Sequence, residues 1–138
     1  MTMSATFFDP ASVRPHSTIG VEGCYSAAHH ALENDDLQHA ERLFAMMLLL
    51  RPSDERGWLG LAVIGERRGA WRFAAALYRA GSAVSRDSVR CLLGLGRALA
   101  ELGRRRDAER ALDEAERKTD DPAVLSAIAR ERARHDLH

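Results

Sequence analysis

Apolar residues recur along this chain at helical spacing in seven successive stretches. These stretches predict helices at about 22–33, 37–50, 54–68, 71–84, 89–102, 104–118 and 123–135. Residues typical of helix starts and stops lie between them, with Asp36 before the second stretch, Pro52 after it, and Gly69 and Gly103 at later turns. Ser53 or Asp54 is expected to cap the third helix, and Asp87 or Ser88 the fifth. The pattern therefore predicts an all-α chain built from short antiparallel helices.

The same pattern of side chains returns every 34 residues. Alanines align in the second helix of each unit, and large apolar residues follow them in phase: Ala40, Ala74 and Ala108, then Phe44, Tyr78 and Leu112. A lone helix pair cannot bury both of its apolar faces, so each unit needs the next one to cover it. We expect three tandem tetratricopeptide-type repeats, at about 21–54, 55–88 and 89–122, that form a short right-handed solenoid.

The two ends of the chain are expected to differ from the repeats. Residues 1–20 contain Pro10 and Pro15 without a sustained helical period, which predicts a flexible N-terminal arm. Its Phe7 and Phe8 could dock on the same chain or on a second copy. Residues 21–138 are expected to be a single repeat domain closed by the capping helix at about 123–135, through Val124, Leu125, Ile128 and Ala129.

One helix has more apolar surface than a single face requires. The run LFAMMLLL at 43–50 is apolar nearly all round, so it should be covered on every side. The expected covers are the first helix, the second repeat, and either the N-terminal arm or another subunit. This run argues mildly for self-association, so a homodimer is one possibility.

Composition excludes several classes of partner. Lys plus Arg equals Asp plus Glu at 20 each, so net charge does not predict a nucleic-acid partner. The longest apolar run is far shorter than the ~20 residues of a membrane span, and the N-terminus lacks the pattern of a secretory signal. Cys24 and Cys91 stand alone in predicted helices, as expected for buried thiols in a reducing compartment. We therefore expect a cytoplasmic protein without stable membrane insertion.

Known catalytic and metal-binding patterns do not appear. There is no phosphate-binding glycine loop, HExxH or GxSxG motif. His29 and His30 are neighbours on a helix and point about 100° apart, so they cannot chelate one metal together. His39 could approach one of them, but a third ligand is lacking. The sequence thus predicts no catalytic residues, no metal, no cofactor and no enzymatic activity.

The inner faces of the first helices are the expected functional surface. In this repeat architecture they line a concave groove, where an apolar strip lies between charged residues. Such a strip favours binding of an extended or helical peptide. The predicted groove residues are Tyr25, His29, Leu32, Leu59, Val63, Arg67, Leu93 and Arg97. The alternative is that Leu59 and Val63 are core residues buried under neighbouring helices.

Several residues resemble the class II chaperones of bacterial type III secretion, which are small three-repeat proteins that hold hydrophobic translocator subunits before export. The matching features are Tyr25 and Ser26 at the start of the first repeat, Ala40 with Phe44, the segment WLGL at 58–61, and, later in the second repeat, Ala74, Tyr78 and Ala83. The resemblance spans about 23–116. It implies a cytosolic chaperone whose groove binds a mostly extended translocator segment and keeps that client soluble and export-competent.

The N-terminal region differs from that family, whose members usually carry a longer helical segment that contributes to dimerisation. Residues 1–20 are short and interrupted by proline, which leaves the dimer open. Two other readings remain. One is a chaperone of a needle subunit or another early export component, which would hold an amphipathic helix. The other is a general repeat scaffold that joins two proteins.

Overall fold

The structure is a computed structural model that describes residues 20–138. These residues form seven α-helices and no strand, which confirms the predicted all-α fold. Each helix begins and ends within two residues of its predicted bounds. The helices are α2 (Val21–Glu33), α3 (Leu37–Leu50), α4 (Glu55–Arg67), α5 (Trp71–Val84), α6 (Val89–Glu101), α7 (Arg105–Arg117) and α8 (Pro122–Arg134). The expectations for the N-terminal arm, Phe7 and Phe8 included, lie outside the described residues.

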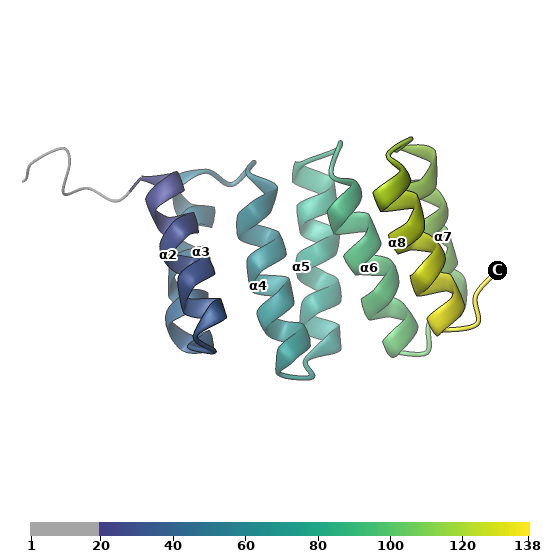
Figure 1. The fold of residues 1–138 in the computed structure, drawn as a ribbon, viewed down its shortest axis with the longest axis horizontal. Coiled ribbons are helices and arrows are strands. Elements are labelled where there is room, and N and C mark those ends of the chain that lie inside the picture. Colours follow the sequence, from purple (N-terminus) through teal and green to yellow (C-terminus); the bar gives the residue numbers. More distant parts are fainter. Residues whose placement is uncertain (1–19) are drawn as a thin grey trace, which may run out of the picture.

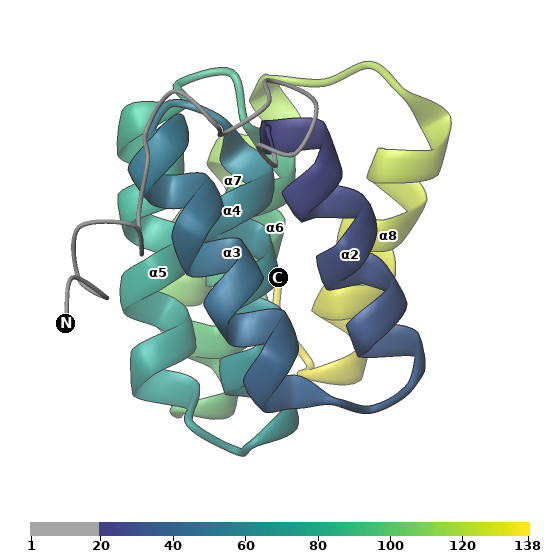
Figure 2. The same ribbon diagram turned by 90° about the vertical axis from the view of Figure 1, so that its left-hand side faces the viewer.

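The helices stand in a row that follows the order of the chain. Figure 1 shows α2 and α3 at one end and α7 and α8 at the other, with α4, α5 and α6 between them. Viewed along the row, α3 and α5 lie on one side of the stack and α2 and α8 on the other (Figure 2). This arrangement separates the first helix of each pair from the second, as expected for stacked helix pairs.

Local signals in the sequence explain where these helices begin and turn. Asp36 accepts a hydrogen bond from the backbone N–H of His39 at 3.2 Å, and Asp54 and Ser88 cap α4 and α6 in the same way. The turns inside the second and third pairs use Gly69 and Gly103 at φ of 71° and 77°, a region that glycine enters without steric cost. In the first pair Asp35 takes this place at φ 57°.

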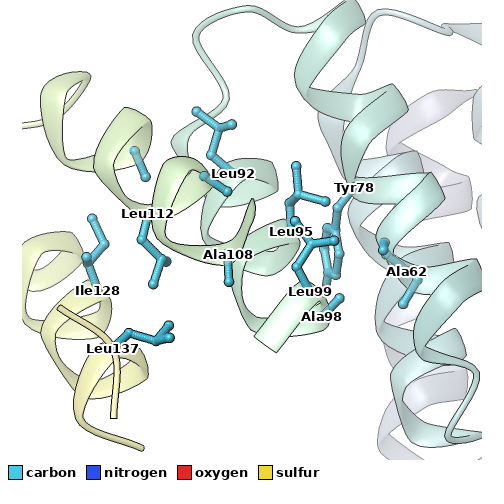
Figure 3. Close-up of a cluster of buried hydrophobic side chains, with 14 residues drawn as sticks. Ala62, Tyr78, Leu92, Leu95, Ala98, Leu99, Ala108, Leu112, Ile128 and Leu137 are labelled. Atoms are coloured by element: carbon cyan, nitrogen blue, oxygen red, sulfur yellow. The ribbon is translucent and has the colours of Figure 1, made fainter. Parts of the chain in front are cut away.

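The buried side chains form two clusters along the row. The first joins α2, α3 and α4 through residues that include Cys24, Phe44 and Met47. The second runs from Ala62 on α4 to Leu137 near the C-terminus and contains Tyr78, with members drawn in Figure 3. Cys24 and Cys91 are fully buried, as predicted. Neighbouring helix pairs thus share their cores, which is why one pair alone would leave apolar surface exposed.

The last helix closes the end of the stack. Ile128 is buried and Val124 packs against the second cluster, as predicted for a capping helix. Ala129 is exposed, so its expected role in the cap is wrong: its side chain is not covered by the helices of the stack. Leu137 is buried beyond the end of α8, where the backbone N–H of Leu137 donates to the carbonyl oxygen of Arg132 at 2.7 Å. The tail after α8 is thus part of the cap.

The apolar run on α3 is only partly covered. Leu43, Phe44 and Met47 are buried against α2 and α4, as expected. The other side of the same helix end remains exposed within residues 20–138, and we call it the α3 apolar patch: Met46, Leu49 and Leu50, at 42%, 85% and 51% exposure. In the described part of the chain, no helix is both long enough and apolar enough to cross a membrane.

Candidate functional site

A hollow of about 420 Å³ runs along the faces of α2, α4 and α6. We call this hollow the inner groove. It takes side chains from three first helices and two second helices, so residues from three repeats meet in it. Its lining residues are Tyr25, His29, Leu32, Glu33, Phe44, Arg56, Leu59, Gly60, Val63, Arg67, Tyr78, Arg90, Leu93, Gly94 and Arg97.

The structure brings all eight residues that the sequence singled out into the lining of the inner groove. Tyr25, His29 and Leu32 come from α2, Leu59, Val63 and Arg67 from α4, and Leu93 and Arg97 from α6. The side chains of Leu59, Val63 and Leu93 are half-buried. Leu59 and Leu93 also pack against the second cluster, while all three remain open to the groove. Leu59 and Leu93 therefore contribute both to the core and to the groove surface, and Val63 adds apolar surface to the groove.

The floor of the groove was not predicted from the sequence. Phe44 and Tyr78 reach the groove from the second helices, although they are almost fully buried. Each ring lies on a glycine of the neighbouring first helix, because a Cβ added at Gly60 or Gly94 would come within 2.3 Å of ring carbons. Both the rings and the glycines are 34 residues apart, and this paired recurrence was the signal that could have identified them.

A fixed arginine lies at one edge of the groove. The guanidinium of Arg56 on α4 lies 4.5 Å from the ring centre of Tyr25 on α2. It donates from Nη2 to Glu22 at 2.6 Å and from Nη2 to Asp54 at 2.8 Å. These hydrogen bonds hold the pKa of both carboxyl groups below their ordinary values. The positive charge of Arg56 is therefore paired within the protein, and its guanidinium covers one face of Tyr25.

A second arginine joins three helices beneath the other edge. Arg97 on α6 donates from Nε to Glu66 Oε1 on α4 at 2.9 Å, and its Nη1 lies 3.4 Å from Glu131 Oε1 on α8. Burial alone would lower the pKa of Arg97, but the charges of Glu66, Tyr78 and Glu131 and the hydrogen bond to Glu66 together outweigh it and keep that pKa above its ordinary value. Because Arg97 also lines the groove, the capping helix is tied to the groove wall.

Tyr78 belongs to the same polar cluster. Its hydroxyl donates to Glu66 Oε1 at 2.8 Å and accepts from Arg97 Nη2 at 3.2 Å. Burial, and then the negative charge of Glu66, raise the pKa of Tyr78 above its ordinary value. The phenol therefore stays neutral at the groove floor, and its hydroxyl donates one hydrogen bond and accepts another within the protein.

The chemistry of this site is that of a binding surface. No group of three or more His, Cys, Asp or Glu side chains within residues 20–138 is arranged to hold a metal ion. What the groove offers is apolar area from Leu59, Val63 and Leu93 beside arginine and tyrosine side chains. Such a surface can bury apolar anchors of a peptide and orient its polar groups without a covalent step.

Comparison with known proteins agrees with this geometry. A family model described as tetratricopeptide repeat matches residues 67–131. No curated protein matches the chain by sequence. Among solved structures, the TPR2B domain of yeast Sti1, in a complex with pHsp70, has a TM-score of 0.79 at 16% identity and covers 86% of this chain and 98% of its own.

Two further solved structures are also similar. The Yersinia enterocolitica type III secretion translocator chaperone SycD has a TM-score of 0.74 at 21% identity, covering 84% of this chain and 87% of its own. PcrH from Pseudomonas aeruginosa has a TM-score of 0.75 at 20% identity, covering 91% and 93%. SycD has been solved with a peptide of the translocator YopD, and PcrH with the chaperone binding region of PopD. The resemblance seen in the sequence is thus confirmed for the tetratricopeptide-repeat fold.

Proposed function

We propose that this protein is a cytoplasmic type III secretion chaperone whose inner groove binds a segment of a hydrophobic translocator. The observation that carries the proposal is the set of eight residues, from Tyr25 to Arg97, that line one groove of the described chain. Support also comes from SycD and PcrH, which share the fold and have been solved with a peptide of the translocator YopD and with the chaperone binding region of PopD.

Binding would work by covering apolar anchors of the client. Each fully buried aliphatic or aromatic anchor contributes about 1.5–3 kcal/mol relative to exposure in water. Arg56 and Tyr78 are already held by hydrogen bonds, so little side-chain conformational freedom is lost at these positions when a client binds. While its apolar segment is covered, the client stays soluble and cannot assemble early. Catalysis has no part in this proposal.

The test is co-expression with the secretion proteins encoded nearby, followed by affinity capture and mass spectrometry. Recovery of a membrane-active translocator that is soluble only together with this chain supports the proposal. Recovery of a small needle-type subunit instead would favour the chaperone of an early export component. If this chain is stable alone and no secretion protein is captured with it, the general repeat scaffold would be the remaining interpretation.

The conformation of the bound client separates the two chaperone readings. An extended translocator segment adds little helical signal to the circular dichroism of the complex. A needle-type subunit held as an amphipathic helix would add much more. A client peptide that gains strong helical signal on binding would therefore contradict the extended-segment proposal.

A further inference from the structure

The four arginines that line the inner groove fall into two kinds. Arg56 contacts the carboxylates of Glu22 and Asp54, and Arg97 contacts those of Glu66 and Glu131. Each of these two guanidinium groups thus has two carboxylates within ion-pair distance. Their charge is satisfied inside the protein, and a client carboxylate would have to compete with those partners.

Arg67 and Arg90 have no such partners. Both are exposed, and neither has a carboxylate within 4.0 Å in the part of the chain from 20 to 138. The guanidinium of Arg67 donates only to the backbone carbonyl of Leu32, at 3.3 Å, which leaves its charge uncompensated. A guanidinium in this state can bind a carboxylate through two parallel hydrogen bonds.

These two arginines lie at opposite rims of the groove. Arg67 is the last residue of α4, whereas Arg90 is the second residue of α6, and both helices run in the same direction (Figure 1). A rise of 1.5 Å per residue places the two backbones about 16 Å apart along the helix direction. The apolar residues Leu59, Val63 and Leu93 lie between them along the helices.

Carboxylates lie near both rims of the groove. Glu33 lines the groove at the end of α2, one residue after Leu32, which Arg67 contacts. At the other rim Arg56 is the second residue of α4, as Arg90 is of α6, and its guanidinium is paired with the carboxylates of Glu22 and Asp54. None of these carboxylates is within 4.0 Å of Arg67 or Arg90 in the described residues, so both guanidinium groups can pair with a client.

We propose that the groove selects a client segment whose apolar anchors are flanked by acidic residues, which pair with Arg67 at one rim and Arg90 at the other. The proposal rests on the peptide-binding function given above and adds the charge of the peptide to it. A basic flank would be repelled by the two unpaired guanidinium groups. Acidic flanks would also speed the encounter at low salt.

Two fluorescein-labelled peptides of twelve residues test this. Both carry the same central segment of apolar residues, and the two ends are aspartates in one peptide and asparagines in the other. We expect the aspartate peptide to bind about tenfold more tightly at low salt, because two exposed ion pairs form together. The difference should shrink below about threefold at about 0.5 M NaCl, because salt screens exposed charges.

A pair of double variants identifies the arginines involved. Arg67→Gln with Arg90→Gln should abolish the preference for aspartate, and each substitution alone should reduce it. The matched control is Arg72→Gln with Arg79→Gln, because both arginines are exposed on α5, lack carboxylate partners in residues 20–138 and line a different hollow. It changes the net charge equally and should keep the preference.

The outcomes separate this inference from the proposed function. Equal binding of both peptides, or equal loss of the preference in both double variants, overturns the acidic-flank inference and leaves groove binding intact. Binding of neither peptide contradicts the groove as a peptide site, and with it the inference.

Discussion

The ring of Phe44 on α3 lies on the backbone of Gly60 on α4, so that a Cβ at Gly60 would come within 2.3 Å of ring carbons. The same contact recurs 34 residues later between Tyr78 and Gly94. Glycine lets the second helix of one repeat approach the first helix of the next and brings the ring to the floor of the inner groove. The two rings therefore connect the stacking of repeats with the shape of the site.

Replacing this glycine should loosen the stack. Gly60→Ala places a methyl group within 2.3 Å of ring carbons of Phe44, so the ring or the helix must shift, and we expect the substitution to lower the free energy of unfolding by about 1–3 kcal/mol. Urea unfolding followed by circular dichroism measures the change. Gly65→Ala is the control on the same helix, because its nearest neighbour is the half-exposed ring of Phe73 at 3.3 Å.

In the control, the alanine should be neutral or should stabilise by up to about 1 kcal/mol through its higher helix propensity. If Gly60→Ala and Gly65→Ala have the same effect, the close contact of Phe44 with Gly60 is not present in solution.

Removing Arg97 should weaken the attachment of the capping helix. Arg97→Met leaves Glu66 and Glu131, at 16% and 13% side-chain exposure, without their cation. Breaking a largely buried pair of this kind costs about 3 kcal/mol. We expect that loss in urea unfolding, together with faster amide hydrogen exchange in α8. Arg110→Met, at a side chain 80% exposed, should change stability by less than about 1 kcal/mol. Equal effects of the two variants would contradict the buried network.

The raised pKa of Tyr78 predicts a loss of stability at alkaline pH. Above the ordinary pKa of about 10, the unfolded tyrosine loses its proton while the folded one keeps it, so unfolding becomes more favourable as pH rises. Tyr78→Phe should be less stable than the parent by about 1 kcal/mol at pH 8, because it lacks the hydrogen bond to Glu66. That gap should narrow toward pH 11, since phenylalanine cannot ionise. A constant gap in urea unfolding across this range would contradict the effect of burial on Tyr78.

The α3 apolar patch predicts a surface that tolerates charge. Leu49 is 85% exposed, so Leu49→Glu should change stability by less than about 0.5 kcal/mol. Met47 is fully buried two residues earlier, and Met47→Ala should lower the free energy of unfolding by about 2–5 kcal/mol. In sedimentation velocity, Leu49→Glu should also weaken self-association if a second copy covers this patch. A large loss of stability in Leu49→Glu would show that the patch is covered in the folded monomer.

The repeat period explains why so much of the fold could be predicted from the sequence. Helix starts depend on local capping groups such as Asp36 and Asp54, and turns depend on residues such as Gly69 that accept positive φ. The groove residues followed from their places on the first helices, because stacking orients those faces alike. All of these signals are local or recur at a fixed spacing.

The rest depends on contacts that the period does not encode. Phe44 and Tyr78 recur in phase in the second helices, but only the missing side chains of Gly60 and Gly94 let their rings form the floor of the groove. Leu137 lies beyond the last repeat, where Arg105 holds the chain by donating to the carbonyl oxygen of His135 at 3.0 Å. The ion-pair networks likewise join residues from different helices. Which charges pair depends on how far each side chain extends in the folded stack, and the repeat period does not give this.

The most direct test of peptide binding in the inner groove compares two glutamate substitutions in the co-expressed complex. Val63→Glu places a carboxylate in the groove lining, whereas Leu49→Glu places one on the α3 apolar patch, outside that lining. Capture of the translocator by each variant is quantified beside its circular dichroism spectrum. We expect Val63→Glu to lose the translocator while keeping its helical spectrum, and Leu49→Glu to keep both. Full translocator capture by a folded Val63→Glu variant would contradict binding in this groove, and unfolding of that variant would mean that Val63 belongs to the core.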